Sequence, residues 1–244
     1  MGDSVRLNKF LSEAGVCSRR EADRRILDGA ITVNGELATV GMQVNPSDEI
    51  CYHGKLITRE EAQVLLLFNK PRGIVCTAEK REQNNVIDYL NYPIRIYPVG
   101  RLDKDSEGLL LMTNQGELVN KIMRASNHHE KEYVVKVDKK ITAKFLEQMR
   151  KGVPILDTVT RECQAKRIDD YTFNIILTQG LNRQIRRMCE YLGYKVVELK
   201  RIRVMNFELG ELAVGQYREV RVGEMATLEE LLATSSSLPG SERD

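Results

Sequence analysis

The sequence has few of the features that assign a chain to a class at once. None of its apolar runs approaches the ~18 residues that a membrane-spanning helix needs. The N-terminal residues Met1–Val5 lack the basic and apolar pattern of an export signal. We therefore expect a cytoplasmic protein without a membrane partner.

Residues typical of metal sites and disulfides are also few. The five cysteines are scattered and odd in number, and no two form a Cys-x-x-Cys pair. This pattern argues against a disulfide framework and a zinc site, and it indicates a reducing compartment. The histidines at 53, 128 and 129 are not at metal-ligand spacing from the cysteines. We expect no metal and no cofactor.

A strong net charge is missing as well. The 244 residues carry a net charge of only +2, so overall charge does not indicate a nucleic-acid partner. Residues 5–25, however, hold six basic residues against three acidic ones, and residues 181–203 hold seven against two. Such clusters can meet phosphates on a nearly neutral molecule, although each could equally be a solvated helix face.

Residues 5–57 have the pattern of a small α+β module. Apolar residues at 7, 10, 11 and 14 predict a helix that ends at Gly15. Ser18-Arg19-Arg20-Glu21 fits a capping box and predicts a second helix from residue 18. Asn34-Gly35, between β-forming residues, predicts a hairpin turn.

This order of elements, with Arg6-Leu7-x-Lys9 and Ser-Arg-Arg-Glu-Ala, resembles the S4 RNA-binding domain. The resemblance implies that helix-borne arginines dock structured RNA, since phosphate contacts position a protein without reading bases. The RNA-binding residues it implies are Arg6, Lys9, Arg19, Arg20, Arg24 and Asn34.

The composition changes after this module, and we predict three parts: an S4-like domain at 1–60, a second domain at 61–232 and a disordered Ser-, Pro- and Gly-rich tail at 233–244. Residues 55–63 are polar and predict a linker. Residues 64–68 predict a buried strand, and Asn69-Lys70-Pro71-Arg72-Gly73 predicts a turn. Thr227-Leu228-Glu229-Glu230 fits a capping box for a last helix.

The centre of the second domain is a charged, glycine-bounded loop, residues 100–108, followed by an apolar strand, 109–113. Loops fixed by a buried strand often carry catalytic side chains, although Asp and Ser in such a loop can simply form turns. A calcium loop is excluded, because its twelfth position is Asn114 rather than glutamate and the following residues form an apolar strand.

Gly-Arg-Leu-Asp-x-Asp-Ser-x-Gly-Leu resembles the active-site motif of pseudouridine synthases of the ribosomal type. Asn-Lys-Pro-x-Gly, Lys131-x-Tyr133 and the string from Gln179 to Met188 resemble further motifs of this family. The resemblance implies that Asp103 is the nucleophile, that Tyr133 stacks on a flipped base, and that Arg186 pairs with Asp103 and keeps it ionised.

The string from Gln179 also has its own pattern. Apolar residues at 185, 188, 189 and 192 predict a helix that ends at Gly193, with Asn182 as its N-cap. Arginines at a helix N-terminus oppose the helix dipole and therefore indicate a bound anion or carboxylate. The further RNA contacts that the resemblance implies are Arg101, Leu102, Lys104, Arg183, Gln184, Ile185 and Arg187.

The resemblance spans residues 5 to about 220 and is greatest to the subgroup that has an S4 domain and modifies ribosomal RNA. It implies an α+β protein whose catalytic domain is a mixed, mainly antiparallel sheet with flanking helices. It implies conversion of uridine to pseudouridine in large-subunit ribosomal RNA, with a tRNA left open as a second substrate. We expect a monomer.

Two other functions remain open at this point. A non-catalytic RNA-binding or ribosome-assembly factor would use the S4 module and be indifferent to Asp103. A hydrolase would cleave the glycosidic bond with two carboxylates, using Asp105 or Glu107 beside Asp103, and would release free uracil.

Overall fold

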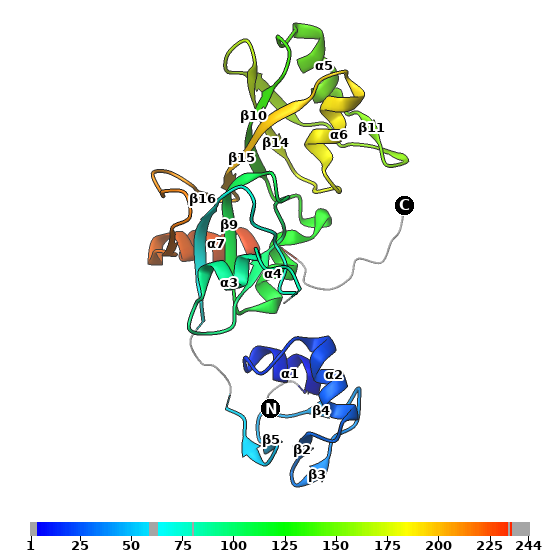
Figure 1. Ribbon diagram of the computed structural model, residues 1–244, viewed down its shortest axis with the longest axis vertical. Coiled ribbons are helices and arrows are strands. Elements are labelled where there is room, and N and C mark those ends of the chain that lie inside the picture. Colours follow the sequence, from blue (N-terminus) through cyan, green and yellow to red (C-terminus); the bar gives the residue numbers. More distant parts are fainter. Residues whose placement is uncertain (1–3, 59–62, 80, 234, 236–244) are drawn as a thin grey trace. The chain divides into compact units, whose positions relative to one another are not determined.

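The computed structural model describes residues 4–58, 63–79, 81–233 and 235 (Figure 1). By its contacts the chain divides into two units. The first comprises residues up to Gln63 with Pro93–Arg95 and Asn114–Gly116, and the second comprises the remainder. No helix among the described residues is long and apolar enough to cross a membrane.

The first unit packs two helices against short strands. Its elements are β1 (Val5–Arg6), α1 (Leu7–Glu13), α2 (Arg19–Leu27), β2 (Ile31–Val33), β3 (Glu36–Leu37), β4 (Gln43–Val44), β5 (Ile50–Tyr52) and β6 (Lys55–Leu56). Strands β3-β2-β5-β6 form one sheet and β1 pairs with β4. Its core joins Leu7 and Leu11 of α1 to Ala22 and Ile26 of α2.

Local signals determine these elements. The Ser18 hydroxyl accepts a hydrogen bond from the Glu21 N–H at 3.2 Å, so Ser18 is the N-cap of α2 as predicted. Asn34 and Gly35 both have positive φ, as the tight turn between β2 and β3 requires. The predicted linker is partly wrong, because Lys55–Leu56 form β6; residues 59–62 lie outside the described part of the chain.

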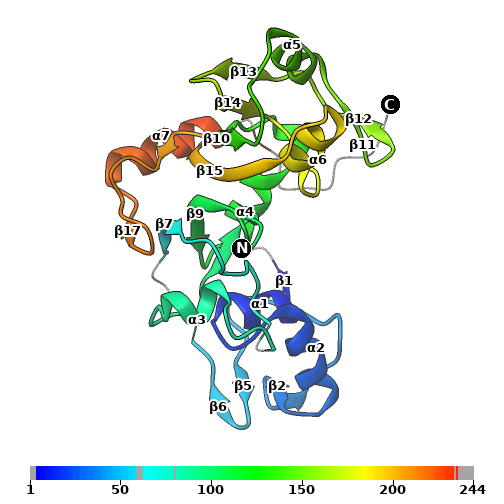
Figure 2. The same ribbon diagram turned by 45° about the horizontal axis from the view of Figure 1, so that its top comes forward.

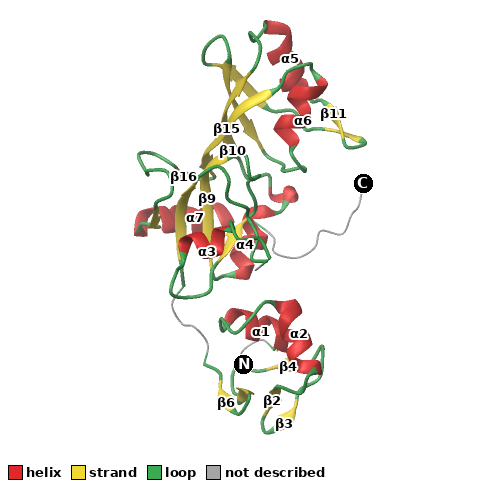
Figure 3. Ribbon diagram, in the orientation of Figure 1, coloured by secondary structure: helices red, strands yellow, loops and turns green. Residues whose placement is uncertain are grey.

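The second unit is built on one large sheet, shown as yellow arrows in Figure 3. Its strands are β7 (Leu65–Lys70), β8 (Tyr97–Val99), β9 (Glu107–Thr113), β10 (Lys131–Val137), β13 (Gln164–Arg167), β14 (Thr172–Leu177), β15 (Val196–Val204), β16 (Phe207–Glu208) and β17 (Tyr217–Glu219). The order is β13-β14-β10-β15-β9-β7-β17, with β16 beside β15 and β8 beside β9. Only the β9–β15 pairing is parallel among the described strands, so the sheet is mixed and mainly antiparallel, as predicted.

Helices cover both halves of this sheet (Figure 2). They are α3 (Val86–Leu90), α4 (Gly116–Met123), α5 (Ala143–Lys151), α6 (Gln184–Tyr191) and α7 (Val222–Leu232), with a 3₁₀ turn at Ala125–Asn127 and a small hairpin of β11 (Pro154–Ile155) and β12 (Thr158–Val159). Helices α5 and α6 share one core with β10, β14 and β15, whereas α4 and α7 share another with β7 and β9. The architecture is therefore α+β.

Two predicted details of the C-terminal region need revision. Helix α7 begins at Val222, with Arg221 as N-cap and the Glu224 side chain bonded back to the Arg221 N–H, so the capping box predicted at Thr227 is wrong. Thr227 instead lies inside the helix, where its hydroxyl donates to the Gly223 carbonyl. Of the predicted tail, only Ala233 and Ser235 lie within the described residues.

The two halves of the sheet meet where Gly108 of β9 pairs with Arg201 of β15. A Cβ atom on Gly108 would collide with the Arg201 carbonyl oxygen and lie 2.8 Å from its nitrogen. The φ of Gly108 is +105°, which a side chain also disfavours. This position therefore requires glycine for two independent reasons.

We expect Gly108→Ala to lower the free energy of unfolding by about 3 kcal/mol or more, because it adds a collision with the neighbouring strand to an unfavourable φ. Gly193→Ala is the matched control: Gly193 has φ +81°, and a Cβ atom added there would meet no non-adjacent residue within 4 Å. That variant should lose only about 1 kcal/mol. Denaturant unfolding measures the free energy of unfolding of both variants, and equal losses in the two would contradict a collision at Gly108.

Candidate active site

Hydrogen bonds with residues 70–76 hold the loop that carries Asp103. Lys70, at the end of β7, donates from Nζ to the Pro71 carbonyl at 2.8 Å and to the Ser106 carbonyl at 2.9 Å. The Leu102 N–H donates to Cys76 Sγ at 3.3 Å, and the Gly73 N–H donates to the Lys104 carbonyl at 2.7 Å. The Asn-Lys-Pro-x-Gly turn is thus a support for the central loop.

Lys70 is fully buried, which is unusual for a lysine. Burial lowers the pKa of its ammonium group, while the charges of Cys76, Asp103, Asp105 and Glu107 act in the opposite direction. Its two carbonyl partners satisfy two of its three donors. A buried cation in this place therefore fixes the loop and contributes positive potential under its carboxylates.

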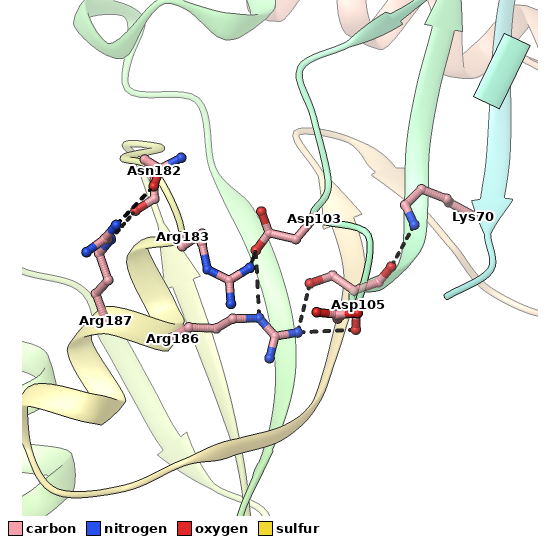
Figure 4. Close-up of polar contacts among 8 residues, drawn as sticks. Lys70, Asp103, Asp105, Asn182, Arg183, Arg186 and Arg187 are labelled. Carbon is pink, nitrogen blue, oxygen red and sulfur yellow. Dashed lines mark hydrogen bonds and ion pairs between the residues drawn. The ribbon is translucent and has the colours of Figure 1, made fainter. Parts of the chain in front are cut away.

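The N-terminus of α6 faces this loop (Figure 4). Arg183 is the N-cap, in the left-handed conformation at φ 50° and ψ 36°, and its side chain does not cap the helix. The prediction of Asn182 as N-cap is therefore wrong. Asn182 is instead bound by Arg187, whose Nε and Nη2 donate to the Asn182 carbonyl and Oδ1 at 3.1 and 3.3 Å.

Two arginines of this segment approach Asp103 (Figure 4). Oδ2 of Asp103 lies 3.3 Å from Nη1 of Arg183 and 3.7 Å from Nε of Arg186. Arg186 also donates from Nη2 to the Asp105 carbonyl and to the Ser106 hydroxyl, both at 3.2 Å. Sequence reasoning anticipated Arg186 beside Asp103 but placed Arg183 only among the RNA contacts.

The two arginines differ in burial. The Arg186 side chain is 14% exposed and the Arg183 side chain 43%. Burial lowers the pKa of Arg186, and the nearby Arg183 adds to this effect, while Asp103 and Asp105 oppose it. Nε of Arg186 is buried and forms no hydrogen bond with any described residue, although Asp103 lies 3.7 Å away. Arg186 thus binds the loop backbone, whereas Arg183 reaches Asp103 from the solvent side.

A cavity of about 360 Å³ opens beside Asp103. This volume suits a small-molecule-sized group such as a nucleobase. Its wall is formed by the loop, by the start of α6 and by one face of strands β10, β14 and β15. The lining includes Arg101, Leu102, Asp103, Tyr133, Leu177, Arg183, Gln184, Ile185, Leu199, Arg201 and Lys131.

The structure thus brings together most of the predicted site residues. Asp103, Tyr133, Arg183 and Arg101 share the cavity, and Arg186 lies behind Asp103. Leu102, Gln184 and Ile185 are almost fully buried in the cavity wall. The Gln184 side chain accepts a hydrogen bond from the Leu181 N–H at 3.0 Å, so it has a structural partner. Lys104 is exposed and Arg187 partly so, outside the lining.

Three buried cations around the site are absent from the predicted site residues: Lys70, Lys131 and Arg201. Lys70 and Lys131 stand in the family motifs, but the motifs gave them no role. Arg201 had been counted in the basic cluster of residues 181–203, yet it is only 2% exposed. The available signal was its place within an apolar strand pattern. Among the described residues, no group of three or more His, Cys, Asp or Glu side chains could hold a metal ion.

The predicted RNA-binding residues of the first unit lie on separate elements. Arg19, Arg20 and Arg24 are exposed on α2, where Arg24 pairs with Glu21 at 2.6 Å. Arg6 precedes α1, and Lys9 lies on α1, 3.6 Å from Glu13. Asn34 has a structural partner, because its side chain donates to Asp48 Oδ1 and accepts from the Glu49 N–H.

Comparison with known proteins agrees with this site. The family model for RNA pseudouridylate synthase matches residues 64–191, and the model for the S4 domain matches residues 5–50. The chain belongs to the RNA pseudouridine synthases. It carries the S4 domain that is expected of one subgroup of these enzymes.

Individual relatives extend the similarity over nearly the whole chain. The chain is 52% identical over 236 residues to the dual-specificity RNA pseudouridine synthase RluF of Escherichia coli (strain K12), covering 96% of this chain and 81% of that protein. It is 38% identical to the ribosomal large subunit pseudouridine synthase B of Bacillus subtilis (strain 168), covering 93% and 96%. A crystal structure of a pseudouridylate synthase superimposes with a TM-score of 0.68 at 31% identity, covering 92% of this chain and all of that one.

We expect Lys70→Met to slow pseudouridine formation in a single turnover by about 10- to 100-fold, because the loop that carries Asp103 loses its two tethers and small misplacements are costly. RNA affinity should stay within about threefold. Lys136→Met is the matched control, since Lys136 is an exposed lysine of β10 with one weak contact to Glu198 at 3.5 Å. A Lys70→Met enzyme as fast as the control would contradict this supporting role.

Proposed function

We propose that this pseudouridine synthase isomerises a specific uridine in large-subunit ribosomal RNA and accepts a tRNA as a second substrate. Two relatives support this choice of substrates, since one is a dual-specificity RNA pseudouridine synthase and another is a ribosomal large subunit pseudouridine synthase. The observation that carries the mechanism is a carboxylate, Asp103, held by two arginines at the mouth of a cavity that Tyr133 lines.

In this proposal Asp103 is the nucleophile. The guanidinium groups of Arg183 and Arg186 lie 3.3 and 3.7 Å from its Oδ2 and hold the carboxylate at the cavity, where a carboxylate can act as a covalent nucleophile. The reaction breaks the bond between N1 of uracil and C1′ of ribose, turns the base and forms a bond from C5 to C1′. A proton leaves C5 and another is bound at N1, so substrate and product are isomers.

Tyr133 and Arg101 handle the extruded base. A flipped base needs a stacking surface, and the Tyr133 ring lies in the cavity wall within the same pocket as Asp103. Arg101 is exposed at the cavity and can occupy the place that the uridine leaves in the RNA. Gln184, Ile185 and Leu102 shape the wall, while Arg187 and Lys104 are available to RNA phosphates.

The alternatives have less support. Asp105 and Glu107, the acids that a glycosidic hydrolase would need beside Asp103, do not line the cavity.

We further propose a monomer that acts in the cytoplasm, with the S4 domain in residues 1–60 and the catalytic domain in 61–232. The S4 domain docks the RNA through Arg6, Lys9, Arg19, Arg20 and Arg24.

We expect Asp103→Ala to abolish pseudouridine formation, with a loss of at least about 10³-fold, because no other group replaces the nucleophile. Pseudouridine mapping on ribosomal RNA and tRNA treated with each enzyme form measures this. Asp105→Asn, an exposed carboxylate of the same loop, should retain modification. Release of free uracil, or a requirement for Asp105, would favour the hydrolase instead.

The combined variant Arg19→Gln, Arg20→Gln and Arg24→Gln should weaken RNA binding and reduce the slope of log affinity against log salt by about 2, because each lost phosphate contact removes about 0.7 to 0.9. The single-turnover rate at saturating RNA should be unchanged. An unaltered salt slope would show that this surface does not bind phosphates.

A further inference from the structure

Two cations lie side by side in the wall of the active-site cavity. Lys131 of β10 is 5% exposed and Arg201 of β15 is 2% exposed, and both belong to the cavity lining. Arg201 is the cross-strand partner of Tyr133, and Lys131 lies two residues before Tyr133. Since side chains two apart on a strand share a face, these three surround one part of the cavity.

Neither cation is neutralised by a carboxylate. Nζ of Lys131 donates to the His129 carbonyl at 3.2 Å, and Nε of Arg201 donates to the Leu109 carbonyl at 2.7 Å. Nη2 of Arg201 is buried and has no hydrogen-bond partner among the residues that the structure describes. Within the described part of the chain, neither side chain forms an ion pair with Asp or Glu.

This arrangement lowers the stability of the folded chain. Burial, and then the charge of Arg201, lower the pKa of Lys131 to about 8. A lysine pKa below its usual value means that the charged form is less stable in the folded than in the unfolded chain. Uncompensated buried charge of this kind is found mainly at functional sites.

Arg203, on the same strand as Arg201, differs from it because carboxylates neutralise its charge. Its Nε lies 2.7 Å from Glu132 and its Nη2 lies 2.8 Å from Glu130. These contacts raise the pKa of Arg203, although burial acts against them. Glu132 and Tyr133 are neighbours on β10 and therefore point to opposite faces of the sheet. Arg203, the partner of Glu132, lies on the face opposite Arg201 although it is only two residues away, because a register shift on β15 separates the two pairs.

We propose that Lys131 and Arg201 stabilise the negative charge that the uracil ring acquires when its glycosidic bond breaks. This inference rests on the proposed function of the cavity. When N1 leaves C1′, both electrons of the bond stay on the base, and the charge is shared among N1, O2 and O4. It disappears when C5 bonds to C1′, C5 loses its proton and N1 gains one. The two cations make and break no covalent bond.

The position of the pair favours the base over a phosphate as its target. The other cations that line the cavity, Arg101 and Arg183, are exposed to solvent, so the phosphates of an RNA can reach them. Lys131 and Arg201 lie beneath, beside Tyr133 and the apolar residues Leu177 and Leu199. An extruded base enters that far, whereas its phosphates stay at the rim. In a buried site of low dielectric, uncompensated positive charge acts strongly on charge that develops nearby.

The first test compares Lys131→Met, Lys131→Arg and Arg201→Lys in single-turnover pseudouridine formation with the full chain and saturating RNA. We expect Lys131→Met to be about 100-fold slower, with RNA affinity within about threefold and a melting temperature no lower than that of the unaltered chain. Lys131→Arg should recover at least tenfold of that loss. Arg203→Lys is the matched control: its melting temperature should fall while its rate stays unchanged.

The second test uses RNA with 2-thiouridine or 4-thiouridine at the target position. Sulfur spreads the negative charge of the departing base, so the reaction should depend less on the two cations. We expect the rate ratio of unaltered enzyme to Lys131→Met to be at least fivefold smaller for one thio substrate than for uridine. A purely structural role would give the same ratio for all three substrates.

Several outcomes would overturn the inference while leaving the proposed function intact, since the unaltered enzyme would still form pseudouridine. One is an unchanged rate in Lys131→Met and Arg201→Lys. Another is weaker RNA binding and a smaller salt slope at an unchanged rate, which would assign the pair to a phosphate. If the loss of rate were proportional to the loss of melting temperature across all variants, the pair Lys131 and Arg201 would have only a structural role. Failure of the unaltered enzyme on every RNA would instead reject the proposed function.

Discussion

The close approach of Gly108 to Arg201 determines where everything else in the catalytic unit lies. It joins β9 to β15 in the parallel pairing that connects the two halves of the sheet. The loop with Asp103 directly precedes β9, and α6 leads into β15. One backbone contact, possible only for glycine, therefore brings the carboxylate from one half of the sheet to the arginines of the other.

The cations around that junction differ in how deeply their side chains are buried, and burial determines which groups each one can contact. Lys70 is fully buried beneath the loop and satisfied by two carbonyl groups, so it holds the loop in place. Arg183 and Arg186 contact Asp103 from the start of α6. Within the described ranges, Lys131 and Arg201 each have one carbonyl partner, and both line the cavity. In the first unit Arg6, Arg19, Arg20 and Arg24 are exposed, and exposed arginines can bind RNA phosphates and release the counterions of the RNA.

The sequence predicted those features that depend on neighbouring residues. Ser18 caps α2, Asn34-Gly35 turns between strands, and the apolar runs that form β7 and β9 are strands. The family motifs predicted the fold and the catalytic class. Predictions failed where contacts between residues distant in sequence matter. Arg183, which meets Asp103, is the N-cap of α6 in place of Asn182, and Arg201 is buried because β15 is a central strand. A count of charges along the chain cannot distinguish a surface arginine from one beneath a cavity.

The pairing of β9 with β15 also governs when the site can exist during synthesis. Asp103 leaves the ribosome long before Arg201, and contacts between residues so distant in sequence form late in folding. A nascent chain that ends before Val196 contains Asp103 and Tyr133, but it lacks β15 and hence the cavity-lining residues Leu199 and Arg201. The cavity is therefore completed only after β15 has been made, and a nascent chain that stops short of β15 lacks part of the cavity wall.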